Sequence, residues 1–179
     1  MFYLFLADGF EETEALAPLD MMRRAKIEVK TVGVTGEFVT GSHGVTVKAD
    51  LKPKEISFNN IDGVVLPGGM PGTINLGKSE TVTKAAVYCA ENGKITAAIC
   101  AAPSVLGNLG ILKGKNATCF PGFEKELEGA TYTAAPVEID GNVITGKGAG
   151  CAILFGKAIV EKAVSAKAAN KVCGDMQCP

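Results

Sequence analysis

The apolar residues of this chain form short continuous runs that alternate with longer segments of helical spacing. Residues 2–7 are apolar throughout, which predicts a buried strand, and residues 12–25 place their apolar side chains on one helical face. Pro18 falls inside that helical segment, so we expect either a kink there or a helix that begins after the first glutamates. Residues 27–34 form the next predicted strand, so the chain opens as strand, helix, strand.

The alternation continues to the end of the chain. Two β-rich runs, 38–40 and 45–47, flank a Gly-Ser-His-Gly segment and predict a small hairpin. The remaining expected elements are strands at 62–66 and 94–99, helices at 79–90 and 101–109, two strands within 137–144 around an Asp-Gly turn, and one long helix from about 151 to 172. This order favours one α/β sandwich domain, residues 1–179, with a mainly parallel sheet.

Charge and hydropathy exclude two classes of partner. The chain has 18 basic and 19 acidic residues and a net charge of −1, without a long run of either sign, so we expect no nucleic acid and no anionic membrane surface as partner. Residues 1–7 are apolar but lack the basic region and the length of a signal peptide, and no other stretch is long enough to span a bilayer. We therefore expect a cytoplasmic protein.

The cysteines do not resemble a disulfide or zinc framework. There is no C-x-x-C, and His43 is the only histidine, so we expect no metal and interpret most cysteines as small buried hydrophobes. Cys173 and Cys178 lie in a tail that contains Gly and Asp. They could oxidise to each other, although a frayed terminus is the favoured interpretation. The full set is Cys89, Cys100, Cys119, Cys151, Cys173 and Cys178.

The segments that follow three predicted strands contain residues suited to binding or catalysis. They are residues 8–14, 67–69 and 99–102. Ligands of such folds bind beyond the carboxyl ends of parallel strands. Cys100 stands where a strand turns into a helix, among alanines that permit a tight turn, and the amides of that helix start would lower the thiol pKa and hold an oxyanion. A lone cysteine would be a core thiol and Pro-Gly-Gly an ordinary turn. Their joint occurrence favours a site.

A reactive thiol needs a proton partner, and three glutamates lie at the same edge of the sheet. They are Glu11, Glu12 and Glu14. A carboxyl group that is desolvated beside the thiol would have a raised pKa and could share its proton. Each of them alone also fits a solvated helix N-terminus, where acids are favoured, and we expect at least two of the three to be only that.

Taken together, these segments resemble the ThiJ/PfpI superfamily, and within it the branch of the parkinsonism-associated protein deglycase and its bacterial relatives. The resemblance covers nearly the whole chain. It implies a flavodoxin-like three-layer α/β sandwich that is usually a homodimer and needs no cofactor. The matching segments are residues 6–14, 20–25, 64–69, 97–103 and 146–150.

The resemblance also implies roles for individual residues. Cys100 would be the nucleophile and Glu14 the protonated carboxyl bonded to its sulfur, and the amides of Gly68, Gly69 and Ala101 would form an oxyanion pocket. The implied activities are conversion of methylglyoxal or glyoxal to a hydroxy acid without glutathione, and repair of early glycation adducts. The implied partner is therefore a small aldehyde substrate.

Two other functions remain open. Similar proteins oxidise the elbow cysteine to a sulfinate, so Cys100 could instead serve a redox sensor or an oxidative-stress chaperone. Catalysis needs room for a three-carbon substrate between Cys100 and Gly68, whereas a sensor needs only access for peroxide. An inert structural relative would have a buried and unreactive Cys100.

The sequence also departs from parts of this superfamily. Ala101 stands where peptidase-like members have a histidine, and no histidine follows His43, which excludes a Cys-His-acid protease or amidotransferase. Phe120 stands where some close relatives have a histidine beside the pocket. Because phenylalanine cannot transfer protons, a mechanism that uses that histidine is not expected here.

Further hypotheses concern the expected dimer interface and two other cysteines. His43 occupies the place of an arginine that approaches the other subunit's active site in relatives, so we hypothesise that it lies near the partner subunit's Cys100 and titrates near neutral pH. A surface-loop histidine is the favoured alternative. Arg24 would help to line that interface. Cys119 and Cys151 could resolve an oxidised Cys100, but packing is the favoured role for both.

Overall fold

A six-stranded sheet lies at the centre of the protein, with the strand order β2-β1-β5-β6-β10-β9. In this computed structural model, which describes residues 1–178, every neighbouring pair is parallel except β10 and β9. The mainly parallel α/β sheet expected from the sequence is confirmed. The strands are β1 (Phe2–Leu6), β2 (Val29–Gly33), β5 (Gly63–Leu66), β6 (Ile95–Ile99), β9 (Val137–Asp140) and β10 (Val143–Gly146).

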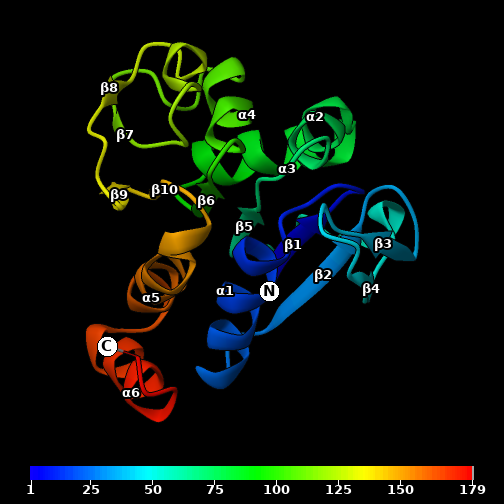
Figure 1. The fold of residues 1–179 in the computed structure, drawn as a ribbon, viewed down its shortest axis with the longest axis vertical. Coiled ribbons are helices and arrows are strands. Elements are labelled where there is room, and N and C mark those ends of the chain that lie inside the picture. Colours follow the sequence, from blue (N-terminus) through cyan, green and yellow to red (C-terminus); the bar gives the residue numbers. More distant parts are fainter. Residues whose placement is uncertain (179) are drawn as a thin grey trace.

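Helices cover both faces of the sheet (Figure 1). The buried residues of α1 (Glu12–Arg24), α5 (Ala152–Ala163) and α6 (Ala166–Asp175) join one hydrophobic cluster with the sheet. Those of α2 (Gly72–Lys78), α3 (Glu80–Glu91) and α4 (Pro103–Asn108) join the other. The smaller elements are the hairpin β3 (Phe38–Thr40) and β4 (Thr46–Lys48), the two-residue strands β7 (Asn116–Ala117) and β8 (Thr131–Tyr132), and the 3-10 turns η1 (Pro53–Glu55), η2 (Glu124–Glu126) and η3 (Ala149–Cys151).

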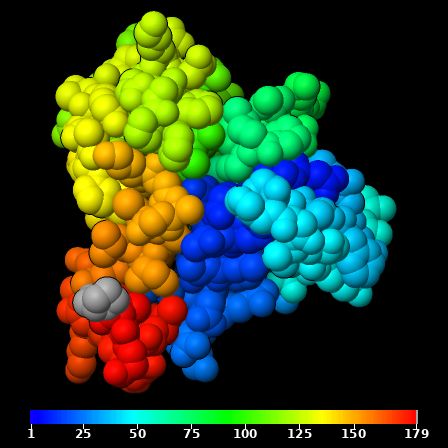
Figure 2. Space-filling model, viewed as in Figure 1, coloured from blue at the N-terminus to red at the C-terminus, as the bar shows by residue number. Residues whose placement is uncertain are grey.

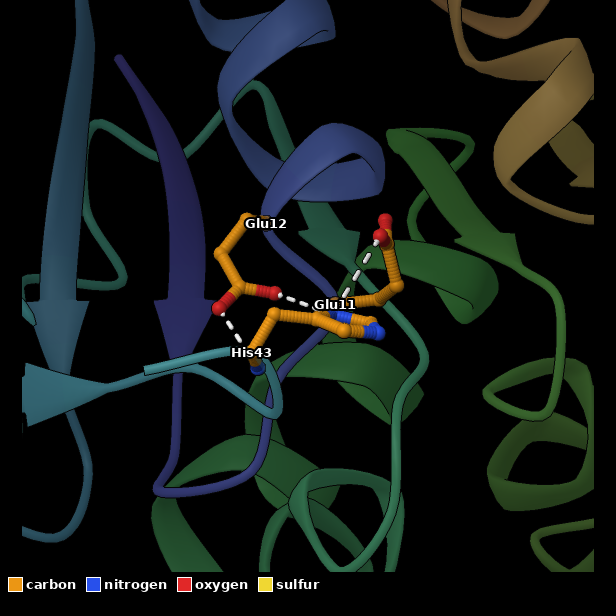
Figure 3. Close-up of side chains that lie close together, drawn as sticks. All are labelled: Glu11, Glu12 and His43. Carbon is orange, nitrogen blue, oxygen red and sulfur yellow. Dashed lines mark hydrogen bonds and ion pairs between the residues drawn. The ribbon is translucent and has the colours of Figure 1, made fainter. Parts of the chain in front are cut away.

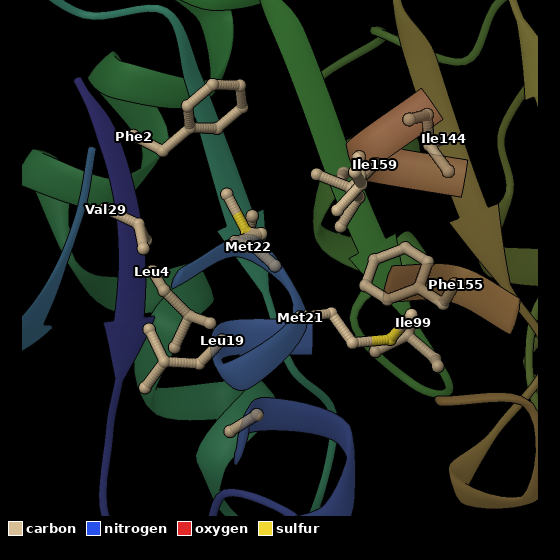
Figure 4. Packing of buried hydrophobic residues seen from close by; sticks show 14 of the residues in the cluster. Phe2, Leu4, Leu19, Met21, Met22, Val29, Ile99, Ile144, Phe155 and Ile159 are labelled. Carbon is tan, nitrogen blue, oxygen red and sulfur yellow. The ribbon is translucent and has the colours of Figure 1, made fainter. Parts of the chain in front are cut away.

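Strand β1 shows why its sequence is apolar at every position. Phe2 and Leu4 face the cluster of α1 and α5, where Figure 4 shows them beside Met22 and Leu19, whereas Phe5 faces the opposite cluster. Side chains alternate between the faces of a strand, and both faces are covered here. Each large apolar side chain buried in this way contributes about 1.5–3 kcal/mol.

Helix α1 begins earlier than its proline suggested. Glu11 is its N-cap and accepts a hydrogen bond from the Glu14 amide at 2.8 Å, so the predicted start at residue 12 is confirmed and the alternative of a later start is wrong. Pro18 lies within the helix and is buried. Helix α5 approaches it closely, since a Cβ at Gly156 would lie 3.0 Å from the Pro18 Cα. Because proline has no amide hydrogen, α1 lacks one backbone hydrogen bond at Pro18, at the place where α5 packs on it.

The C-terminal segment is two helices, and the prediction of one long helix from 151 to 172 is wrong. Val164 and Ser165 separate α5 from α6, and the Ser165 side chain caps α6 by accepting from the Ala168 amide at 3.2 Å. The fraying of the tail stays a prediction. Cys173 lies in α6, and its carbonyl accepts from the Cys178 amide at 2.9 Å.

The hairpin brings a distant segment to the start of α1. The Gly9 amide donates to the Thr40 carbonyl, and the Ser42 amide to the Phe10 carbonyl, both at 2.8 Å. Figure 2 shows the cyan hairpin segment seated against the blue N-terminal segment. None of the helices within residues 1–178 has the length and apolar character needed to cross a bilayer.

Candidate active site

Cys100 occupies a tight elbow between β6 and α4. Its φ is +66°, a left-handed conformation that is rare outside glycine. Its backbone is held on both sides, since its amide donates to the Gly146 carbonyl and its carbonyl accepts from the Phe120 amide, each at 2.8 Å. The side chain is half-buried. The tight strand-to-helix elbow expected at Cys100 is therefore present.

Glu14 is the glutamate that faces this thiol. It lies in the first turn of α1 with no exposed surface, and its Oε2 accepts from the Gly68 amide at 2.9 Å. The Cys100 side chain borders this carboxyl, since a Cβ at Gly68 would lie 2.7 Å from both the Cys100 Cβ and the Glu14 Oε2, while the Glu14 Oε1 has no hydrogen-bond partner among residues 1–178. Burial raises the Glu14 pKa to about 7, against the opposing effect of the Cys100 thiol and the Gly68 amide. Glu14 therefore remains partly protonated at neutral pH.

The thiol and this carboxyl each influence the pKa of the other. Burial, the negative charge of Glu14 and the hydrogen bond to it raise the pKa of Cys100 to about 12, although the amides of Ala101 and Gly69 act to lower it. The net direction is opposite to the sequence expectation. A proton on Glu14 removes the repulsive charge and lets the carboxyl donate to sulfur, so the two groups titrate as a pair. At neutral pH these pKa values leave the proton on Cys100, as the thiol.

The two glycines after β5 have different positions relative to this pair. A Cβ at Gly68 would lie 2.7 Å from both the Cys100 Cβ and the Glu14 Oε2, so no side chain fits there. The Gly68 amide is taken up by Glu14, whereas the amides of Gly69 and Ala101 face the sulfur. Gly69 adopts a φ of +88°, and a Cβ there would lie 2.4 Å from the Glu11 nitrogen. Of the three predicted oxyanion donors, Gly69 and Ala101 are thus directed toward the thiol.

Of the predicted accessory residues, Phe120 lies next to Cys100 and Arg24 lies far from it. Phe120 lies next to the elbow through its backbone bond to Cys100, and its side chain is half-exposed. Arg24 lies at the far end of α1, about 15 Å along the helix from Glu14. It pairs with Asp20 at 2.7 Å. Within one chain, Arg24 is therefore remote from Cys100.

His43 has a partner that the sequence did not reveal. Its Nδ1 lies 3.0 Å from the Glu12 Oε2, and its amide donates to the Glu12 Oε1 at 2.8 Å (Figure 3). Burial acts to raise the Glu12 pKa, but the hydrogen bonds from His43 and from backbone amides lower it to about 2. The bond to Glu12 in turn raises the His43 pKa. No local pattern signalled this pair, because Glu12 and His43 meet only when the hairpin docks on α1.

Glu11 joins this pair in the one cluster of residues 1–178 with the spacing of metal ligands, since donor atoms of Glu11, Glu12 and His43 lie within 4.8 Å of one another. Protein donors already occupy it. The Glu12 Oε1 also accepts from the Val45 amide at 3.3 Å, and the Glu11 Oε2 accepts from the Glu14 amide. The ion pair therefore accounts for this arrangement, and we assign no metal to it.

The two cysteines considered as resolving thiols differ in access. Cys119 is fully buried, and burial and the charge of Glu124 raise its pKa to about 11, which fits packing. Cys151 is half-buried at the start of α5.

Comparison with known proteins agrees with this geometry. The family model described as DJ-1/PfpI family matches residues 2–162. DJ-1 homolog B of Arabidopsis thaliana is 39% identical over 159 residues, which is 88% of this chain and 36% of that protein. A deglycase of Pyrococcus abyssi is 32% identical, over 79% of this chain and 86% of its own length. This chain thus spans about a third of the plant relative.

A solved structure extends the similarity to three dimensions. Toxoplasma gondii DJ-1, in an oxidized form, superposes with a TM-score of 0.94 at 31% identity, covering 98% of this chain and 97% of that one. The flavodoxin-like arrangement is therefore shared almost from end to end.

Proposed function

The chain belongs to the DJ-1/PfpI family, and on this premise we propose that it is a cofactor-free enzyme that converts small 2-oxoaldehydes, such as methylglyoxal and glyoxal, to hydroxy acids. The observation that carries the proposal is the fully buried Glu14 carboxyl, which the Gly68 amide holds at 2.9 Å beside Cys100. Burial raises its pKa to about 7. A group that titrates near neutral pH can both give and take a proton during turnover.

In the first step the proton of the Cys100 thiol moves to the Glu14 carboxylate. The Cys100 thiolate then attacks the aldehyde carbon of methylglyoxal and forms a carbon–sulfur bond. The aldehyde oxygen becomes an alkoxide beside the amides of Gly69 and Ala101 and takes the proton from Glu14. The product is a hemithioacetal, and Glu14 is left as a carboxylate.

The second step moves hydrogen between the two carbons. The Glu14 carboxylate removes the proton from the former aldehyde carbon and returns it to the neighbouring carbon, while the hydroxyl proton passes to the second oxygen. The first carbon is oxidised and the second reduced, so no external oxidant is needed. Water then hydrolyses the resulting lactyl thioester, which releases lactate and restores the thiol of Cys100. The sum is methylglyoxal plus water to lactate.

The same groups support deglycation. In an early hemiaminal adduct of methylglyoxal with an amine, the Cys100 thiolate attacks the carbon that carries the nitrogen, and the carbon–nitrogen bond breaks as Glu14 gives its proton to the departing amine. The product is the same hemithioacetal, which enters the second step. The name of the Pyrococcus abyssi relative, a deglycase, favours an activity of this type.

A redox function is the second candidate. The unpartnered Oε1 of Glu14 and the amides of Gly69 and Ala101 could bind the oxygens of a Cys100 sulfinate. The Toxoplasma gondii DJ-1 structure in an oxidized form is consistent with oxidation in this family. In that case Cys100 would report peroxide, and aldehyde turnover would be incidental.

The deciding experiment measures D- and L-lactate formed from methylglyoxal without glutathione, in fully reduced protein. We expect Cys100→Ser and Glu14→Gln each to lower kcat at least about 100-fold. Cys178→Ser, in the C-terminal tail, is the matched control and should retain full activity. Absence of lactate in the wild type, together with rapid reaction of Cys100 with peroxide, would favour the redox function instead.

A further inference from the structure

Helix α6 ends in a turn that brings two cysteines together. The Cys178 amide donates to the Cys173 carbonyl at 2.9 Å, and the Gln177 amide donates to the Gly174 carbonyl at 3.1 Å. Gln177 has a φ of +55°, in the left-handed region. These two hydrogen bonds around one left-handed residue form a Schellman motif, in which the side chains at the places of Cys173 and Cys178 frequently contact each other.

The first of these hydrogen bonds limits how far apart the two cysteines can lie. The path from the Cys173 Cα through its carbonyl and the 2.9 Å hydrogen bond to the Cys178 Cα spans at most about 7 Å. Cysteines whose Cα atoms are more than about 7 Å apart cannot be bridged without movement of the backbone. Cys173 and Cys178 are therefore within reach of a disulfide bond.

The two side chains also interact electrostatically. Burial and the neighbouring Cys178 thiol raise the pKa of Cys173, whereas Lys157 on α5 acts to lower it. None of the other shifted cysteine pKa values within residues 1–178 responds to a second cysteine. Cys173 and Cys178 are both free thiols and only half-buried, so a small molecule can reach the pair.

We propose that Cys173 and Cys178 are a site of reversible disulfide formation, which small disulfides such as glutathione disulfide oxidise. Because the Cys173 pKa is raised, we assign the first attack to Cys178. Its thiolate attacks the small disulfide, so that a mixed disulfide forms and one small thiol leaves. The thiolate of Cys173, which the charge of Lys157 favours, then attacks the Cys178 sulfur and releases the second small thiol.

The exchange balances without any other reactant. Two protein thiols become one disulfide, and the small disulfide is reduced to two thiols. Each departing thiolate takes up the proton that the attacking thiol has lost. The site is separate from the reaction proposed for Cys100, because neither step uses that thiol.

The test equilibrates the full chain with mixtures of glutathione and glutathione disulfide, blocks the remaining thiols and maps the tryptic peptides by mass spectrometry. Cleavage after Lys171 leaves both cysteines in one peptide. We expect this peptide to lose two hydrogens and to carry no glutathione. Cys173→Ser should instead keep glutathione on Cys178, because the second step is lost. Cys151→Ser is the control and should form the disulfide as the wild type does.

Two variants of Gln177 test the role of the turn. Gln177→Gly suits the left-handed conformation and should keep the ratio of disulfide to dithiol in a given glutathione mixture. Gln177→Pro cannot adopt that conformation and lacks the amide that binds Gly174, so the ratio should fall at least about tenfold. An equal ratio in Gln177→Pro would overturn the proposal. A wild-type peptide that stays reduced, or that carries glutathione without an internal disulfide, would do so as well.

Discussion

The Gly68 amide and the Glu14 carboxylate oxygen meet at 2.9 Å, so a glycine on the β5 loop holds the carboxyl that faces the thiol. The absence of a side chain is as important as the amide, because a Cβ at Gly68 would collide with both Cys100 and Glu14. The geometry of the reactive pair therefore depends on a residue that carries no functional group.

Replacement of Gly68 should disturb the arrangement of Cys100 and Glu14. In Gly68→Ala the new Cβ must displace Glu14 or Cys100 by several tenths of an ångström or more, which we expect to destabilise the protein by about 1–3 kcal/mol and to lower lactate formation at least about tenfold. Urea denaturation and the lactate assay measure the two effects. Gly174→Ala, where a Cβ meets nothing within 4 Å, is the control. Full activity in Gly68→Ala would mean that this close contact is relieved without consequence.

Glu14 should make the protein less stable as the pH rises. Its pKa is 4.5 ordinarily and about 7 in the folded protein, so the folded state holds the proton more tightly. The resulting stabilisation is complete below pH 4.5 and is lost as the pH rises through about 7, an effect on the order of 3 kcal/mol. Denaturation of wild type and Glu14→Gln at pH 4 to 8 should show this slope only in the wild type. Parallel profiles would contradict the assigned protonation.

Glu12 and His43 should also make the stability of the protein depend on pH, but in pH ranges that differ from that of Glu14. The Glu12 pKa is lowered to about 2, so its stabilisation is present above pH 4.5 and is lost as the pH falls toward 2. The raised pKa of His43 gives stabilisation that is complete below 6.5 and is lost as the pH rises through the raised value. An NMR titration should give a His43 pKa above 6.5, which Glu12→Gln lowers. A His43 pKa unchanged by Glu12→Gln would exclude this pairing.

The same histidine tests the dimer hypothesis, which remains a proposal. If His43 lies near the partner subunit's Cys100 in a homodimer, His43→Ala should change the pH profile of lactate formation. Light scattering coupled to size exclusion gives the oligomeric state of both proteins. An unchanged profile in a confirmed dimer would restrict His43 to its contact with Glu12.

Two helical glycines should respond in opposite directions to alanine. At Gly156, in α5, a Cβ would lie 2.6 Å from the Met21 sulfur and 3.0 Å from the Pro18 Cα, so Gly156→Ala should destabilise the protein by about 1–3 kcal/mol. At Gly174, in α6, there is open space, so the same change should stabilise it by about 0.5–1 kcal/mol. Urea denaturation distinguishes the two. Equal effects would contradict the close packing of α5 on α1.

The sequence predicted most strands because buried parallel strands are continuously apolar, as β5 and β6 are. It missed α2 because Pro71, Gly72 and Gly77 are typical of loops. Ser165 was a signal for the break between α5 and α6, yet the run rich in Ala and Lys around it suggested continuity. In contrast, Ser79 precedes α3 but makes no capping bond through its side chain.

The sequence placed Cys100 and three glutamates at one edge of the sheet, and only the resemblance to relatives selected Glu14 among them. The structure brings Glu14 next to Cys100, while the energetics of the pair were not predictable. The raised pKa of Cys100 depends on burial. The partner of the Gly68 amide depends on how the loop after β5 is placed relative to the first turn of α1. Neither quantity is encoded in local spacing.

The left-handed backbone conformation of Cys100 lowers the stability of the folded protein. A residue with a Cβ pays on the order of 1–2 kcal/mol to stay in that conformation, and glycine would avoid this cost. A glycine there would keep the two backbone hydrogen bonds of the elbow, to Gly146 and Phe120, but would lose the packing of the Cys100 side chain against the core. The backbone of this elbow therefore does not itself require a thiol.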